Sequence, residues 1–309
     1  MELIRPDTQI DFMGQSRLLG TISVVLVVVF LAIMMFRGFN LGIEFAGGTL
    51  VHIALPEEAA NVGEGVLRGA MSDLGHPKAT IVRFGAAEER EFRITVPQSE
   101  EEQKELSLGI LDGLTEKLGV PVKMEATESI GPRVGEEMRR AGFGSVALAC
   151  FLILIYVWFR FDLRYAPGAV LALLHDVIIT AGIFALFQLE FNLQVLAALL
   201  VVIGYSLNDT IVIYDRIREN LEIRGTTHLE EVVNQSINQT LSRTLLTSMT
   251  TLIVVLALLL LGGPVVRDFA LALTIGVTVG TYSTVYVASA LLVLLERYWG
   301  GKTPATVSS

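Results

Sequence analysis

The sequence lacks most of what an enzyme or a metalloprotein needs. It has one cysteine, Cys150, which excludes an internal disulfide, and no partner ligands for a metal lie near it in the sequence. There is no G-x-S-x-G or H-E-x-x-H motif, and GGKT at 300–303 has Glu296 where a phosphate-binding loop needs its first glycine. No basic tract indicates nucleic-acid binding. We therefore expect neither an enzyme nor a protein with a metal, cofactor or nucleic-acid site.

Charge is also scarce, whereas apolar residues are abundant. Only 18% of the residues are charged and 52% are hydrophobic, with a mean hydropathy of +0.59, which predicts an integral membrane protein. Six apolar segments have the length of about 20 residues that crosses ~30 Å of hydrocarbon. The expected spans lie near 18–36, 143–159, 166–187, 192–214, 245–263 and 269–295.

The loops between these spans differ in their lysine and arginine content. Two loops carry almost no charge, only Glu190 in one and Arg267 in the other. The opposite side carries Arg5, Arg17, Arg160, Arg164, Arg216, Arg218, Arg224, Arg243, Arg297 and Lys302. The positive-inside rule then places both termini in the cytoplasm and the long segment after the first span outside. The expected division is 1–39 (N-terminus and first span), 40–136 (outside domain), 137–297 (five spans) and 298–309 (cytoplasmic tail).

The long outside segment has the composition of a soluble domain. Four stretches favour strands and two favour helices, in the order βαββαβ that is typical of a ferredoxin-like fold. The strands are expected at 49–55, 79–84, 91–96 and 120–127, and the helices at 57–75 and 99–119. The sequence thus predicts a polytopic α-helical membrane protein with six transmembrane helices and a ferredoxin-like extracytoplasmic domain.

The stretch IGYSLNDTIVIYDR (203–216) places a carboxylate inside an apolar span. Such a group costs roughly 2.5–3.5 kcal/mol on insertion scales, so Asp209 calls for an explanation. Arg243, at the start of the fifth span, has a comparable depth and the opposite sign, and we expect the two to pair. Together with Asn208 and Thr247 they form the candidate proton path.

Two interpretations of this polar set remain open. In the first, Asp209 and Arg243 are a structural ion pair, and the serines and threonines of the spans only help helices to pack. In the second, Asp209 loses its partner, takes up a proton and acts as a two-state switch. His175 and Asp176, in the middle of the third span, are a candidate second polar site, for which we favour a hydrogen bond that stabilises the helix.

Five stretches carry a recognisable family pattern: LGIEFAGGT (41–49), ESIGPRVGEEM (128–138), LLHDVIITAGIF (173–184), GYSLNDTIVIYDRIREN (204–220) and NQSINQTLSRTLLTSMTT (234–251). Together they resemble the SecF proteins of the SecD/SecF family. The resemblance covers residues 10–297, and one departure is Glu44, where the family pattern has Asp.

This resemblance implies a function, partners and a location. The family is similar to the resistance–nodulation–division (RND) transporters, in which two six-span halves pack about a pseudo-twofold axis. The chain would be one half, with SecD as an obligate partner, in the cytoplasmic (inner) membrane. It would use the proton motive force to complete translocation of unfolded polypeptides, at the SecYEG channel with SecA, with YajC and YidC as further candidate partners. The alternatives are a proton-coupled exporter half of the RND type and a passive scaffold that docks SecD to the translocon.

Overall fold

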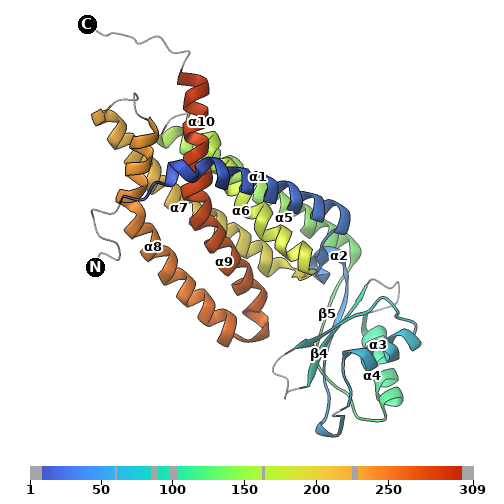
Figure 1. The fold of residues 1–309 in the computed structure, drawn as a ribbon. Helices are drawn as coiled ribbons and strands as arrows, with labels where there is room; N and C mark the ends of the chain where they lie inside the picture. Colours follow the sequence, from blue (N-terminus) through green and yellow to red (C-terminus); the bar gives the residue numbers. More distant parts are fainter. Residues whose placement is uncertain are drawn as a thin grey trace.

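Six long helices form a bundle, and a small α+β domain lies beyond one end of it (Figure 1). The computed structural model describes residues 9–59, 61–84, 90–97, 103–161, 164–224 and 229–300. Each of the six helical segments is long and apolar enough to cross a membrane, which confirms the expected spans. They are α1 (Phe12–Arg37), α5 (Pro132–Arg160), α6 (Ala166–Phe187), α7 (Leu193–Arg224), α8 (Leu229–Leu261) and a composite of α9 (Gly263–Ser283), the π-helical turn η2 (Thr284–Ala288) and α10 (Ser289–Gly300).

The apolar pattern underestimates the length of several helices. The second span, expected to begin near 143, begins at Pro132. The fourth and fifth spans, expected to end near 214 and to begin near 245, continue as helix to Arg224 and from Leu229. Polar side chains connect these two extensions. For example, Asn220 Nδ2 of α7 donates a hydrogen bond to Ser236 Oγ of α8 at 2.8 Å. Hydropathy therefore marks the part of each helix that suits hydrocarbon, not the whole helix.

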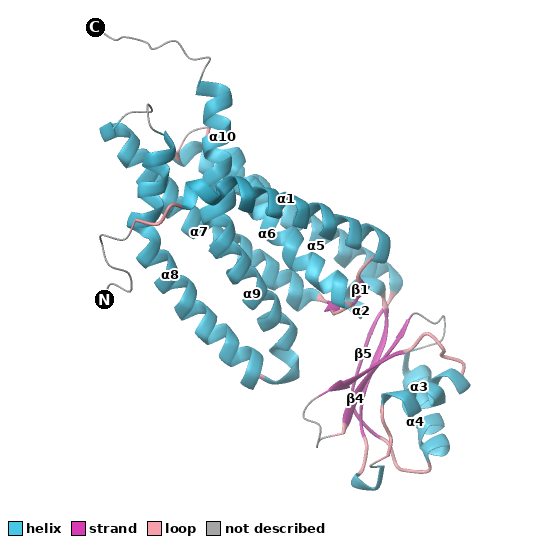
Figure 2. Ribbon diagram, viewed as in Figure 1, coloured by secondary structure: helices cyan, strands magenta, loops and turns pink. Residues whose placement is uncertain are grey.

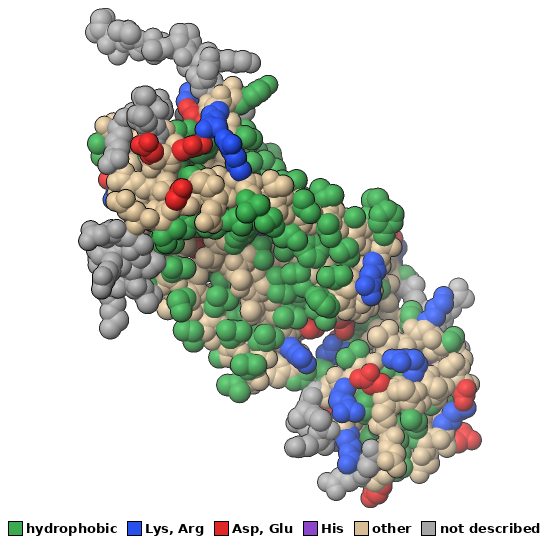
Figure 3. All heavy atoms as spheres, in the orientation of Figure 1, with side chains coloured by type: hydrophobic (Ala, Val, Ile, Leu, Met, Phe, Trp, Pro, Cys, Tyr) green, Lys and Arg blue, Asp and Glu red, His purple; other side chains and the backbone are tan. Residues whose placement is uncertain are grey.

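The outer surface of the bundle matches a lipid environment. Figure 3 shows hydrophobic side chains covering its length, with charged side chains gathered at the two ends and on the domain. Helices α1, α5 and α8 are little buried, whereas α6, α7 and the composite last helix are about half buried and form the centre. The polar residues of interest lie on or beside these central helices.

The small domain is an antiparallel four-stranded sheet with two helices on one face (Figure 2). The strand order β3-β4-β2-β5 is the order of a ferredoxin-like fold, so this prediction is confirmed. Inward-facing Val51, Ile53 and Ile94 pack against Leu67 and Leu114 of the two helices. The elements are β2 (Gly48–Ala54), the short turn η1 (Glu57–Ala59), α3 (Glu64–Asp73), β3 (Thr80–Phe84), β4 (Glu91–Pro97), α4 (Gln103–Leu118) and β5 (Lys123–Ile130).

The domain joins the bundle through two adjacent strands. β2 begins at Gly48, whose register partner in β5 is Ile130, and a single residue separates β5 from α5. Gly48 has φ +143, and a Cβ there would lie 2.6 Å from the carbonyl oxygen of Val96, so only glycine fits. Before this junction, α2 (Ile43–Ala46) packs against the start of α5.

A short parallel pairing, which the sequence did not indicate, closes the same end of the bundle. β1 (Asn40–Leu41), just after α1, pairs with β6 (Glu190–Phe191), between α6 and α7. Each strand has two residues, too few to show any alternation of polar and apolar residues. This pairing holds the end of α1 against the α6–α7 loop.

Candidate functional site

Asp209 is buried between α7 and α8, with one of its two oxygens unpaired. Its side chain is 3% exposed, in spite of its charge. Thr247 Oγ1 of α8 lies 3.5 Å from Asp209 Oδ1, at the limit of a hydrogen bond. Asp209 Oδ2 has no hydrogen-bond partner among the described residues. A buried carboxylate so weakly paired is well suited to take up a proton.

Arg243 does not form the expected ion pair with Asp209. Among the residues that the structure describes, no ion pair joins them, and both Arg243 and Asn208 are exposed at the surface of the bundle. The reason lies in the register of the two helices, which puts Thr247, one turn beyond Arg243, beside the carboxylate. The guanidinium is still near enough to attract Asp209 through space. Asp209 and Arg243 are therefore not paired in this structure.

A second row of hydroxyls links α7, α8 and α9 one turn from Asp209. Ser248 Oγ accepts from Tyr205 at 3.3 Å and from Thr281 at 2.8 Å. Most other threonines of these helices donate to a carbonyl of the preceding turn, as Thr251 does to Thr247 at 2.9 Å. Such local bonds satisfy the hydroxyls within their own helix. The polar stripe thus contributes mainly to packing, apart from the residues around Asp209 and Ser248.

His175 and Asp176 do form a hydrogen bond, as the sequence led us to favour, and Asp176 is the centre of a larger network. His175 Nδ1 lies 2.9 Å from Asp176 Oδ1. Asp176 Oδ2 accepts from Ser206 of α7 at 2.6 Å and from Ser283 of α9 at 2.8 Å. The carboxyl group is fully buried and has three partners, so it joins three helices. Asp209 lies on the α8 side of α7, whereas Ser206 faces α6 and α9.

The small residues of α9 make this close helix packing geometrically possible. A Cβ on Gly276 would lie 2.2 Å from Val202 of α7, and one on Gly280 would lie 3.1 Å from Ser206. The G-x-x-x-G pattern brings α7 and α9 together within this chain. It therefore does not form a free face for another subunit.

A group of carboxylates at the domain end of the bundle was not foreseen as a site. Arg93 of β4 reaches Glu190 of β6 with Nη1 3.4 Å from Oε2, which links the domain to the bundle. Asn192 donates to Asp268 at 3.1 Å, and the buried Oε2 of Glu44 has no partner among the described residues. Burial raises the pKa of Glu190. The charge of Arg93 opposes this shift, whereas the nearby carboxylates of Asp268 and Glu44 raise the pKa further.

Comparison with known proteins decides the family. Residues 111–298 match the model "Protein export membrane protein SecD/SecF, C-terminal", and residues 32–53 match "SecD/SecF GG Motif". The chain belongs to the SecD/SecF family. It is a SecF-type subunit of the protein translocase and acts in protein export. The first of these matches includes α5 to α10, and with them Asp209 and Asp176.

Individual SecD/SecF relatives extend the match over nearly the whole chain. The SecF subunit of Magnetococcus marinus is 45% identical, with coverage of 96% of this chain and 95% of that protein. The SecF subunit of Escherichia coli O157:H7 is 42% identical, with coverage of 92% and 87%. The crystal structure of a translocon-associated SecDF from Thermus has a TM-score of 0.85 at 41% identity, and covers 96% of this chain and 40% of that longer one.

Proposed function

We propose that this SecF-type subunit works with SecD to draw on the proton motive force in protein export, with Asp209 as its protonation site. The observation that carries the proposal is a buried carboxylate, one of whose oxygens has no partner among the described residues, with an arginine nearby that does not bond to it. One charge crossing the membrane releases about 2.3 kcal/mol per 100 mV, which is adequate to change the charge state of a group at this depth. The work would help unfolded polypeptides to complete translocation.

Arg243 acts in this proposal as the group that biases Asp209. Arginine stays charged at all relevant pH values and so cannot release the proton itself. When α7 and α8 bring it against Asp209, the ionised carboxylate would be stabilised; when they part, that stabilisation would be lost and proton uptake would become easier. Alternation between these arrangements would couple helix movement to proton entry and exit. Residues 128–142, where β5 continues into α5, would pass the movement to the domain.

The orientation and the division into parts also belong to this proposal. The excess of lysine and arginine predicts a cytoplasmic N-terminus and first span in 1–39, an outside domain in 40–136, five spans in 137–297 and a cytoplasmic tail in 298–309. The domain would then face the side on which the exported chain emerges. The protein would span the inner membrane with both termini in the cytoplasm.

SecD is the partner expected on the face that holds the proton path. Asn208 precedes buried Asp209 in α7, and Arg243 lies one turn from Thr247 in α8; both are exposed. A charged side chain on a lipid-facing surface is unfavourable. A second bundle against α7 and α8 would cover both. The SecDF relative of Thermus thermophilus carries the matching region in 38% of a longer chain, which supports this arrangement. SecYEG with SecA, and YajC and YidC, remain the further expected partners.

Two other functions compete with this one. A passive scaffold that docks SecD to the channel would need no titratable group at Asp209. An RND-type exporter half would be expected in a chain of double length with a large outside domain in each half. The first alternative is the stronger, because the Asp176 network shows that this bundle also uses a buried carboxylate for packing.

The decisive experiment is a translocation assay of Asp209→Asn with and without a proton gradient. We expect the variant to fold and to bind SecD, and to lose the stimulation that the gradient gives to the wild type. Asp215→Asn is a matched control, because Asp215 lies on the same helix but is exposed and pairs with Arg160 at 3.1 Å. Stimulation of Asp209→Asn at the wild-type level would favour the scaffold.

A further inference from the structure

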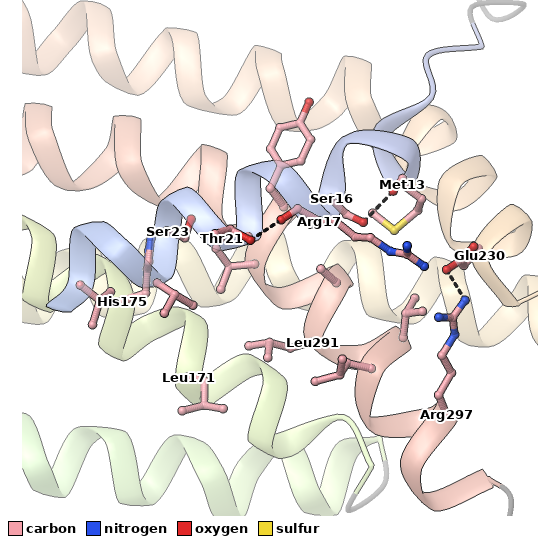
Figure 4. Close-up of a pocket in the computed structure, with 18 of the residues that line it drawn as sticks. Met13, Ser16, Arg17, Thr21, Ser23, Leu171, His175, Glu230, Leu291 and Arg297 are labelled. Carbon is pink, nitrogen blue, oxygen red and sulfur yellow. Dashed lines mark hydrogen bonds and ion pairs between the residues drawn. The ribbon is translucent and has the colours of Figure 1, made fainter.

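A groove of about 790 Å³ lies between α1 and the η2–α10 segment, away from the Asp209 site. Its walls are mostly aliphatic, with Val24 and Val28 of α1 facing Leu291 and Leu294 of α10. Two small residues, Gly20 and Ala290, leave the room between the helices. Figure 4 shows that the groove runs beside α1, with Arg17 at one end and His175 of α6 at the other.

Charged side chains gather at one end of this groove only. Arg17 and Arg297 lie there with Glu230, to which Arg297 is paired. Among the described residues, Arg17 has no ion-pair partner and is exposed. Two arginines and one glutamate leave a net positive charge at the mouth. This end is the cytoplasmic one by the excess of lysine and arginine, and anionic lipids attract basic residues there.

The length of the groove matches one leaflet of a bilayer. Between Arg17 and Val28, α1 rises about 16 Å, at 1.5 Å per residue. Half of a ~30 Å hydrocarbon core is about 15 Å. An acyl chain whose headgroup lies at Arg17 would therefore reach the end of the aliphatic walls near the middle of the membrane.

The deep end of the groove contains a polar atom that the described protein leaves unpaired. His175 is 4% exposed, and its Nδ1 bonds Asp176, but its Nε2 has no hydrogen-bond partner among the described residues. The ring lines the groove. That nitrogen is itself buried, so an apolar occupant of the groove leaves it unchanged and keeps water from the His175–Asp176 pair.

We infer that this groove binds an anionic phospholipid of the cytoplasmic leaflet. Its headgroup lies between Arg17 and Arg297, and one acyl chain lies along Val24 and Val28 towards His175. Aliphatic walls one leaflet long, with a positive mouth at one end only, are complementary to an anionic head and a single chain. The acyl chain packs against Val24, Val28 and Leu294, which are otherwise exposed on the surface of the bundle.

The test uses a phosphatidylglycerol with a photoactivatable diazirine midway along one acyl chain. The full chain with its SecD partner is placed in nanodiscs that contain this probe, and cross-links are mapped by mass spectrometry. We expect cross-links at Val24, Val28 and Leu294, all in the groove, well above those at Val25 and Val29, which are exposed on α1 outside it. Equal labelling of the two sets would indicate bulk lipid only and would overturn the inference.

Two variants test separately the contribution of the acyl chain and that of the headgroup. Gly20→Leu puts a side chain into the groove and should abolish the groove cross-links, whereas Gly144→Leu on α5 should keep them; a Cβ at either glycine meets nothing within 4 Å. Arg17→Gln should weaken labelling about fivefold, the factor that corresponds to one basic residue near an anionic membrane surface. Two results would overturn the proposal. One is equal labelling by a phosphatidylcholine probe, and the other is equal labelling of the Gly20→Leu variant and the wild type.

Discussion

Thr247 of α8, and not Arg243, lies beside Asp209 of α7, with Oγ1 3.5 Å from Oδ1. The same hydroxyl lies 3.1 Å from the carbonyl oxygen of Arg243 and 2.9 Å from that of Thr244. A hydroxyl has one hydrogen to donate, so Asp209 receives at best a shared and long hydrogen bond. The carboxylate is thus held in place by burial and not by strong bonds.

Arg243→Leu should stop gradient-dependent translocation while it leaves stability almost unchanged. Arg243 is exposed and makes no ion pair with Asp209 in this conformation, so its loss should change the free energy of unfolding by no more than about 0.5 kcal/mol. Translocation assays and thermal unfolding of the same preparation measure both effects. The double variant Asp209→Asn with Arg243→Leu should remain inactive. Recovery of gradient-dependent translocation in the double variant would show that the two residues are structural.

Glu190 should make stability depend on pH. Its pKa is raised by burial, so the folded protein binds more protons than the unfolded chain between the ordinary value of about 4.3 and the raised one. Stability should therefore fall as pH rises through that interval. Glu190→Gln should flatten the dependence, as followed by thermal unfolding over a pH series. The control is Glu219→Gln, an exposed carboxylate paired with Arg216; a wild-type slope in Glu190→Gln would contradict the assignment.

Gly276→Ala should separate α7 from α9. The new Cβ would lie 2.2 Å from Val202 Cγ2, and Val202 is fully buried. Overpacking of this kind costs typically 1–3 kcal/mol. In Gly144→Ala, on the exposed side of α5, the Cβ meets nothing within 4 Å, so that variant should be neutral or slightly more stable. Equal melting temperatures for the two variants would contradict this close helix contact.

The orientation can be tested by cysteine labelling after Cys150 is replaced by serine. Ser72 is exposed on α3 of the small domain, and Glu222 is exposed near the far end of α7. A membrane-impermeant maleimide added to intact cells should label Ser72→Cys and not Glu222→Cys. Inverted membrane vesicles should give the opposite result. If only Glu222→Cys were labelled in intact cells, the orientation would be the opposite of the one proposed.

The sequence predicts helices and faces better than it predicts contacts between side chains. The six spans and the βαββαβ order follow from runs and alternation of apolar residues, which are local properties. The relation of Asp209 to Arg243 does not, because depth along two helices leaves open which residue of α8 faces α7. Thr247 takes that position, and the arginine turns outward.

The contacts at the domain end could not be predicted from the sequence for a different reason. Arg93 and Glu190 are 97 residues apart, and they meet only because the sheet stands against the α6–α7 loop. β1 and β6 are two residues long, below the length at which a pattern can be seen. The Asp176 network likewise depends on α7 and α9 meeting at Gly280, which adjoins Ser206.

The adjacent strands at the junction make the small domain an insertion between α1 and α5. Gly48 of β2 and Ile130 of β5 are directly opposite each other on neighbouring strands. Such partners in an antiparallel pair have Cα atoms about 4.5–5.5 Å apart. The chain thus leaves the bundle and returns to it at nearly the same place. A short glycine-containing turn could replace 49–129 without moving either helix, and a different soluble module could be grafted there. The membrane part and the outside part could therefore have been exchanged independently during evolution.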